Sequence, residues 1–189
     1  MASEARQLPL PVALRDDATI DNFWFADGLE PLRGCLQDRD HHTAPVVYLS
    51  GGADSGRTHL LQAACQDWPA GDALYLPLEA LRGMDPADVL AGVERLRQVC
   101  LDDLQAVAGD PAWEEALFHA YNRAQASGCR LVFSADQPPA ALPVELADLA
   151  SRLAAALVFR LPAPGDVEKA RILRLRADRR GLQLPDDVI

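Results

Sequence analysis

The sequence predicts an α/β fold, in which an open parallel β-sheet lies between two layers of helices. Two observations support this fold class. Short apolar runs rich in β-branched and aromatic residues alternate with helical stretches along most of the chain. A glycine-rich loop joins the first of these runs to a helix, which is the context of phosphate-binding loops. The 189 residues are enough for one domain of ordinary size.

The predicted elements follow one another in a regular order. A helix over Leu29–Gln37 comes first, and a polar loop follows it. Five strands are then expected at Val46–Ser50, Ala73–Leu78, Gln98–Leu104, Cys129–Asp136 and Leu157–Leu161. The intervening helices are expected at about Thr58–Trp68, Asp85–Leu96, Asp110–Gly128 and Leu142–Ala156, and a last helix at about Asp166–Arg180.

Charge and composition exclude several classes of protein. The formal net charge is −10, whereas proteins that bind a nucleic-acid backbone by themselves are usually basic, so we expect contact with DNA only indirectly. No apolar run approaches the ~20 residues that a membrane span needs, and the N-terminus is charged where a secretory signal is apolar. We therefore expect a cytoplasmic protein without membrane contact. The four cysteines form no CxxC pair, which argues against a zinc or redox motif.

The loop between the first strand and the next helix has the spacing of a nucleotide-binding motif. Two glycines enclose four residues, and Gly56-Arg57-Thr58 stands where such loops have Gly-Lys-Ser/Thr. Backbone N–H groups of this loop and of the helix N-terminus would bind phosphate oxygens. The candidate nucleotide-binding residues are Gly51, Gly52, Ala53, Asp54, Ser55, Gly56, Arg57, Thr58 and His59.

Arg57 is the unusual residue of this loop. A planar guanidinium replaces a compact ammonium, so nucleotide binding can survive while hydrolysis of the γ-phosphate is more doubtful. Thr58 would offer its hydroxyl to Mg²⁺. The alternative for the whole loop is a glycine-rich strand–helix turn without a ligand.

Acidic residues end two other predicted strands at the same edge of the sheet. Asp102 would hold Mg²⁺ through water, and Asp103 would orient an attacking water. Asp136 would sense the γ-phosphate or position that water. The alternatives are a surface loop with two solvated acids, or a helix N-cap, for the first pair and a turn cap for Asp136. Ligands of open parallel sheets bind at the carboxyl ends of the strands, which favours the functional interpretation.

Arg152 lies in a predicted helix on an apolar background. Taken alone, it is compatible with an arginine whose stem covers the helix face while its head reaches water.

Several segments together resemble one known family. In chain order they are QLPLPV, TIDNFWFADG, GGADSGRTHLLQAAC, VCLDDLQAVAGD, LFHAYNRA, LVFSADQPP and DLASRLAAALVFRL. They are similar to the ATPase core of DnaA-type AAA+ proteins, and the chain most resembles the Hda family, the DnaA-homologous regulators of replication initiation. Hda-type loops also carry Gly-Arg-Ser/Thr. The resemblance implies an AAA+ P-loop ATPase core, with its five-stranded parallel sheet between helices, and the start of a small helical lid.

The resemblance also implies a function. Hda-type proteins bind ADP, dock on the DNA-loaded sliding clamp and stimulate ATP hydrolysis by the DnaA initiator. Arg152 matches the arginine finger that acts in trans on the partner's nucleotide. The clamp-binding motif is matched by Gln7, Leu8, Pro9, Leu10 and Pro11. Trp24 and Phe25 match the segment near the adenine, although ordinary core packing is an equal alternative for them.

The resemblance divides the chain into three parts. Residues 1–19 are expected to be a flexible arm with the clamp-binding motif, residues 20–164 the nucleotide-binding core, and residues 165–189 the first part of a lid. We expect the chain to be truncated within that lid, so no residue is assigned to the second sensor arginine.

Three functions remain open from the sequence. The leading one is a regulator with ADP or ATP and Mg²⁺ as cofactors, with weak or no ATPase activity of its own, and near the nucleoid through the clamp. The second is a self-sufficient AAA+ ATPase or loader, and the third is an adaptor with a dead nucleotide pocket. A homo-oligomer is compatible with each of them.

Overall fold

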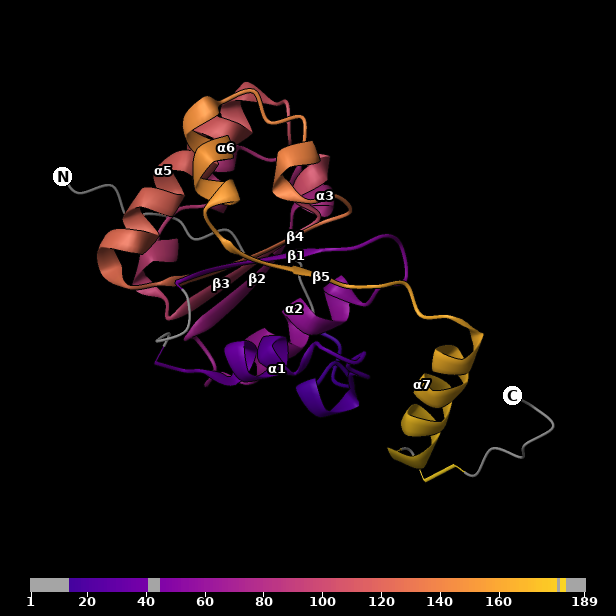
Figure 1. Ribbon diagram of the computed structural model, residues 1–189. Helices are drawn as coiled ribbons and strands as arrows, with labels where there is room; N and C mark the ends of the chain where they lie inside the picture. The colour runs from indigo at the N-terminus through magenta and orange to yellow at the C-terminus, as the bar shows by residue number, and fades with distance from the viewer. Residues whose placement is uncertain (1–13, 41–44, 180, 183–189) are drawn as a thin grey trace.

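A five-stranded sheet forms the centre of the computed structural model, which describes residues 14–40, 45–179 and 181–182 (Figure 1). The strands are β1 (Val46–Ser50), β2 (Ala73–Pro77), β3 (Gln98–Asp102), β4 (Arg130–Ala135) and β5 (Leu157–Arg160). Their order is β2-β3-β4-β1-β5, and all neighbouring strands are parallel. The predicted α/β fold and its parallel five-stranded sheet are therefore confirmed.

Helices precede and follow these strands. The α-helices are α1 (Glu30–Gln37), α2 (Arg57–Gln66), α3 (Leu78–Leu81), α4 (Pro86–Val89), α5 (Pro111–Ser127), α6 (Ala147–Ala154) and α7 (Asp166–Arg179). Short 3-10 helices lie at η1 (Ile20–Asn22), η2 (Val93–Arg95), η3 (Leu104–Ala106) and η4 (Pro139–Ala141). In Figure 1, α1 and α2 cover one face of the sheet, while α3, α5 and α6 cover the other.

Alternate residues of each strand pack on opposite faces of the sheet, because successive side chains of a strand point in opposite directions. In β1, Val46 and Tyr48 belong to the core under α5 and α6, whereas Val47 and Leu49 belong to the core over α1 and α2. All residues of β1, β3 and β4 are buried. Burial on both faces explains why these strands are almost continuously apolar in the sequence.

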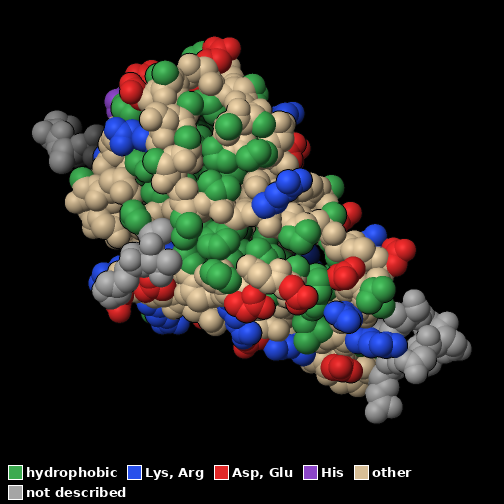
Figure 2. Space-filling model, viewed as in Figure 1, with side chains coloured by type: hydrophobic (Ala, Val, Ile, Leu, Met, Phe, Trp, Pro, Cys, Tyr) green, Lys and Arg blue, Asp and Glu red, His purple; other side chains and the backbone are tan. Residues whose placement is uncertain are grey.

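The edge strand β5 differs from the central strands. Leu157 and Val158 are 37 % and 40 % exposed, and within the described part of the chain only β1 pairs with this strand. Figure 2 shows hydrophobic side chains gathered across the middle of the corresponding face, with charged side chains mostly around them. The sheet therefore ends in an apolar, partly exposed edge.

The predicted helix over residues 85–96 is wrong in its extent. Asp85 caps the N-terminus by accepting a hydrogen bond from the Ala87 N–H, as expected for an Asp-Pro start, but α4 ends at Val89. Gly92 then takes a positive φ of 75° and precedes η2. A left-handed residue cannot continue a right-handed helix, which divides the segment in two.

The predicted helix over residues 142–156 begins too early. The α6 helix starts at Ala147, because the preceding segment is held in another way. The buried carboxylate of Glu114 in α5 accepts hydrogen bonds from the backbone N–H groups of Glu145 and Leu146. Because the Glu114 carboxylate in α5 binds these N–H groups, the backbone before Ala147 is not helical.

The last helix, α7, stands apart from the sheet in Figure 1 and follows β5 through a proline-containing segment. Its Ala177 is buried, whereas Val167 and Leu173 are 61 % and 52 % exposed. Across residues 14–40, 45–179 and 181–182, no helix is both long and apolar enough to cross a membrane.

Candidate nucleotide-binding site

The glycine loop between β1 and α2 has the backbone of a phosphate cradle. Gly56 has a positive φ of 87° and forms the N-cap of α2 without a side-chain cap. The N–H groups of the first helical turn therefore have no side-chain acceptor at this cap, and together with the helix dipole they favour an anion. A Cβ atom on Gly56 would lie 2.5 Å from Cε2 of Phe23, so only glycine fits here.

A second close approach fixes the start of the loop. A Cβ atom on Gly51 would lie 2.6 Å from Oγ of Ser55 and 2.8 Å from the carbonyl oxygen of Leu161. The Leu161 N–H in turn donates to the Ser50 carbonyl at 2.7 Å. The loop is therefore packed directly against the chain that leaves β5.

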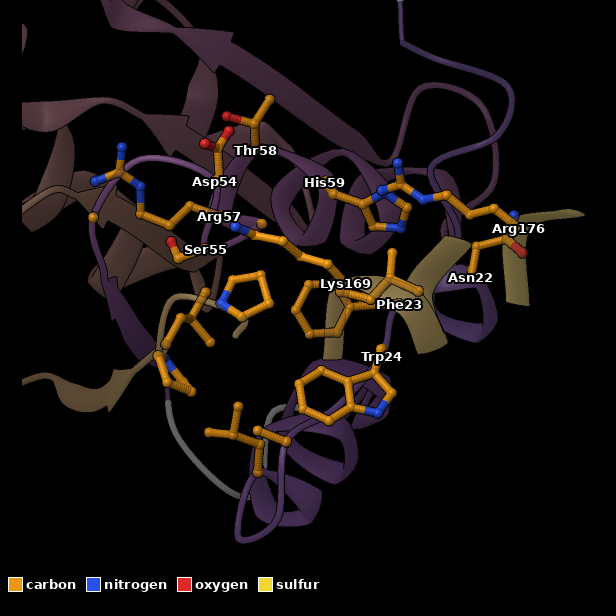
Figure 3. Close-up of a pocket in the computed structure, with 18 of the residues that line it drawn as sticks. Asn22, Phe23, Trp24, Asp54, Ser55, Arg57, Thr58, His59, Lys169 and Arg176 are labelled. Carbon is orange, nitrogen blue, oxygen red and sulfur yellow. The ribbon is translucent and has the colours of Figure 1, made fainter. Parts of the chain in front are cut away.

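The loop opens into a pocket of about 570 Å³ between the core and α7 (Figure 3). Phe23, Trp24 and Leu29 supply apolar surface from one side, and Ile172 and Leu173 supply it from α7. Among the residues that the structure describes, one acid, Asp54, and four cationic side chains line the pocket; the cations are those of Arg15, Arg57, Lys169 and Arg176. An excess of positive charge in a chain of net charge −10 suits a ligand with an apolar part and phosphates.

Most of the predicted nucleotide-binding residues line this pocket. They are Gly52, Asp54, Ser55, Gly56, Arg57, Thr58, His59 and Trp24. Gly51 and Ala53 belong to the loop without lining the pocket. Phe25 does not line it either; its ring packs edge-on against Phe23, with centroids 4.8 Å apart. The aromatic residue that the sequence interpretation missed is Phe23, which touches both the loop and the pocket.

Arg57 binds protein groups at the edge of the loop. Its Nη1 donates to the Gly51 carbonyl at 2.8 Å, and its Nη2 lies 3.1 Å from Oδ1 of Asp103. The side chains of Arg57 and Asp103 are 12 % and 22 % exposed. The guanidinium fork thus joins the phosphate loop to the end of β3, a contact that a single ammonium cannot reproduce.

Asp102 is buried at the end of β3. Its Oδ2 accepts from the Tyr75 hydroxyl at 2.7 Å, and its Oδ1 accepts from the Ser134 hydroxyl. Burial and the nearby Asp102 raise the pKa of Tyr75 well above its usual value, which keeps this phenol a donor. Asp102 does not line the pocket, whereas Thr58 does. The Mg²⁺ role of Thr58 and Asp102 therefore remains a prediction.

Asp103 adopts the left-handed backbone conformation, with φ of 57°. Besides Arg57, its Oδ1 accepts from Nε2 of Gln105 at 2.9 Å, and Oε1 of Gln105 accepts from the Asp136 N–H at 3.2 Å. Gln105 thus links Asp103 to the end of β4. The Asp136 residue itself is exposed. The acids at the ends of β3 and β4 lie at one edge of the sheet, as expected, but their catalytic roles remain predictions.

His59 is partly buried in the wall of the pocket. One ring nitrogen lies 3.0 Å from the Thr19 carbonyl oxygen, which requires an N–H there. Burial lowers the pKa of His59 below its usual value, and the bond to Thr19 opposes this shift only in part. The neutral ring therefore ties the segment before α1 to α2.

The residues present fit a nucleoside phosphate. Among the residues the structure describes, Ser55 Oγ is a buried side-chain atom in the pocket wall without a hydrogen-bond partner. The uncapped N-terminus of α2 and the cationic lining offer donors for phosphate oxygens. The aromatic and aliphatic side chains at the other end offer surface for a base. The loop end of the pocket therefore suits the phosphates of a nucleotide, and its aromatic and aliphatic end suits the base.

Arg152 lies in α6, on the opposite side of the sheet from α2 (Figure 1), and does not line the pocket. Its guanidinium carbon stands 4.9 Å from the ring centroid of Phe118 and 5.2 Å from that of Tyr121, both in α5. Two aromatic faces thus hold the cation by cation–π attraction. The Arg152 side chain is separated from the chain's own candidate nucleotide site.

The predicted clamp-binding residues Gln7–Pro11 lie outside the residues that the structure describes. Besides Phe23, the sequence interpretation missed Lys169 of α7 and Arg15, whereas it considered Arg176 as one of several arginines of this helix that could contact phosphates. The sequence marks α7 only as rich in cations. It carries no signal for which of them face the loop, because that depends on how α7 packs.

Comparisons with known proteins agree with this geometry. Residues 78–160 match the family model of the bacterial DnaA ATPase domain. The chain is similar to the structure of domain III of the Thermotoga maritima replication initiation protein DnaA, with 25 % identity and a TM-score of 0.78, over 94 % of this chain and 80 % of that one.

Two further structures are similar in fold. AMPPCP-bound DnaA from Aquifex aeolicus has 18 % identity and a TM-score of 0.76, over 93 % of this chain and 59 % of that one. A RuvB variant from Thermotoga maritima has 17 % identity and a TM-score of 0.65, over 90 % of this chain and 56 % of that one. This chain thus spans little more than half the length of those two proteins. By fold it is an AAA+ P-loop ATPase domain, and it is similar to the ATPase domain of the bacterial initiator DnaA.

Proposed function

We propose that this protein is a regulator of DNA replication initiation that binds ADP or ATP, docks on the DNA-loaded sliding clamp and stimulates ATP hydrolysis by a DnaA-type initiator. It thereby inactivates the initiator and represses initiation. Docking involves the segment Gln7–Pro11, and stimulation involves Arg152. The similarity to DnaA ATPase domains supports a role in replication initiation.

The observation that carries the proposal is the environment of Arg152. Its guanidinium stacks on Phe118 and Tyr121, on the other side of the sheet from the chain's own pocket. A cation that stacks on two rings and lies outside the chain's own nucleotide pocket suits a residue that acts on a partner's phosphates. Such a finger contributes roughly 10³–10⁵ in rate to a partner's hydrolysis.

The nucleotide pocket supports the part of the proposal that concerns ADP or ATP. Its cationic lining and the cradle of the glycine loop suit phosphates. The pairing of Arg57 with Asp103 favours a bound nucleotide that is not turned over, because the carboxylate proposed to orient water is already engaged. A nucleotide-loaded protein that acts on another protein's ATP is consistent with both features.

A second candidate is a self-sufficient AAA+ ATPase or loader. The observation that favours it is the acid pair Asp102-Asp103 at the carboxyl end of β3, one strand removed from the strand that precedes the loop. ATP turnover by the isolated protein, well above that of the Asp103→Asn variant, would support this candidate.

The proposal is tested by measuring ATP hydrolysis by a DnaA-type initiator on clamp-loaded DNA, with and without this protein. We expect stimulation by the wild type, and its loss in Arg152→Ala and in Gln7→Ala. Arg152→Lys keeps the charge but not the planar fork, and should retain little stimulation. Arg95→Ala removes an exposed arginine outside α6 and serves as the control, with full stimulation expected.

The outcomes separate the alternatives. Stimulation that survives Arg152→Ala would overturn the finger role. Clamp binding without ADP binding or stimulation would favour a nucleotide-free adaptor. Hydrolysis by the isolated wild type without any effect on the initiator would favour the loader.

A further inference from the structure

Two cationic side chains of the candidate nucleotide site differ in their contacts: Arg57 is bound to protein groups, whereas Lys169 has only a weak contact within the described part of the chain. The loop position that carries the phosphate-binding lysine in comparable loops is Arg57. Its guanidinium binds the Gly51 carbonyl and the Asp103 carboxylate, at 2.8 and 3.1 Å. In Figure 3 it points away from the middle of the pocket. A phosphate over the loop therefore needs its positive charge from another residue.

Lys169 of α7 faces the pocket from the opposite side. It lines the same cavity as Ser55, Gly56 and Thr58. In Figure 3 its side chain extends from α7 toward Ser55 and Arg57. Among the described residues its ammonium contacts one carboxylate, that of Asp166, at 4.0 Å, and the two side chains are 59 % and 104 % exposed. A contact at this distance and exposure holds the ammonium only weakly, so the ammonium is available to a ligand.

We propose that Lys169 supplies the phosphate-binding cation of this site. Its ammonium contacts the phosphates of a nucleoside diphosphate cradled by the loop, in place of a lysine at position 57. The inference rests on the nucleotide binding in the proposed function and adds the residue that recognises the phosphates. A compact ammonium on a long flexible stem suits this task, because it can follow phosphate oxygens that a fixed guanidinium fork does not reach.

Two further features of the pocket agree with this assignment. The buried Ser55 Oγ has no partner among the residues the structure describes, and it stands on the side of the loop toward which Lys169 extends in Figure 3. Ile172 and Leu173 follow Lys169 by three and four residues, which places them on the same face of α7, and they line the pocket too. One face of α7 thus presents both a phosphate-binding cation and apolar surface to the ligand.

The experiment measures the dissociation constants of ADP and of adenosine for the full chain by isothermal titration calorimetry. Lys169→Ala should weaken ADP binding by about ten- to a hundredfold, the range for a lost charge-assisted hydrogen bond. Binding of adenosine, which has no phosphate, should change by less than about twofold. Lys169→Arg should recover most of the ADP affinity, because the charge and the long stem are kept.

Arg171→Ala is the matched control. It removes one positive charge from the same helix, and Arg171 is exposed and does not line the pocket. A change in ADP affinity below about threefold is expected, since exposed charges at this distance are screened. The Tm of each variant, measured by thermal unfolding, checks that the substitution does not destabilise the protein.

Three results would overturn the inference. An unchanged ADP affinity in Lys169→Ala would leave nucleotide binding intact and assign the phosphates to other residues. An equal loss for ADP and adenosine would mean that Lys169 only packs against the ligand. A wild type that binds no ADP would remove the nucleotide part of the proposed function as well, whereas failure to stimulate an initiator would leave the Lys169 result unaffected.

Discussion

The ion pair between Arg57 and Asp103 is open to a direct test by a double-mutant cycle. Arg57→Gln keeps a long stem and good helix propensity at the first residue of α2 but removes the charge. Asp103→Asn suits the partner, because asparagine tolerates the left-handed conformation with φ of 57° and still accepts from Gln105. Each substitution therefore removes the charge pair between residues 57 and 103 and is compatible with the local backbone conformation.

The expected coupling follows from the burial of the two side chains. Exposed ion pairs contribute about 0.2–1 kcal/mol, and hydrogen bonds to charged groups about 1.5–3 kcal/mol. With 12 % and 22 % of the side chains exposed and one contact at 3.1 Å, the pair lies between these cases. We expect a coupling free energy of about 1 kcal/mol, which corresponds to roughly 2–4 °C in Tm for a protein of this size.

The assay is urea unfolding of the wild type, both single variants and the double variant, without nucleotide. The coupling is the free energy by which the double variant departs from the sum of the single effects. It should decrease moderately between low salt and 1 M NaCl, because part of the pair is exposed. A coupling below about 0.3 kcal/mol would refute the reasoning, since Arg57 would then be free for phosphate and the case for Lys169 would weaken.

Three further predictions concern the loop, a histidine and the cysteines. Gly56→Ala should abolish measurable ADP binding and lower stability by about 2 kcal/mol, because its Cβ meets the Phe23 ring and its φ is positive; calorimetry and urea unfolding measure both, and normal ADP binding would contradict the loop geometry. Burial lowers the pKa of His59 below the unfolded value of about 6.5, so the unfolded chain takes up the proton first and stability falls as the pH drops through 6.5. His59→Gln should make urea stability less dependent on pH between 7.5 and 5.5, and an unchanged slope would show that His59 is not the group responsible. All four cysteines are buried, and burial raises the pKa of Cys129 to about 11. A thiol reagent at pH 8 should therefore label the unfolded but not the folded protein, and fast labelling of the native chain would contradict the packing.

The local elements were predictable because their signals are local. The mainly apolar runs of β1, β3 and β4 mark strands buried on both faces. Asp85 and Asp110 each cap a helix that begins with proline, as their sequence pattern indicates. The extents of two helices were wrong because the decisive factors were a left-handed glycine at residue 92 and a carboxylate, Glu114, far away in sequence.

The candidate site divides in the same way. The sequence by itself determined that a glycine loop follows the first strand and that acids end later strands, because parallel strands bring their carboxyl ends to one edge. Only the tertiary structure decided that Arg57 binds Asp103, that Arg152 stacks on two rings of α5, and that Lys169 faces the loop. Each of these contacts joins segments that are distant in the chain and depends on how their side chains are oriented. Composition and local spacing carry no information on that orientation.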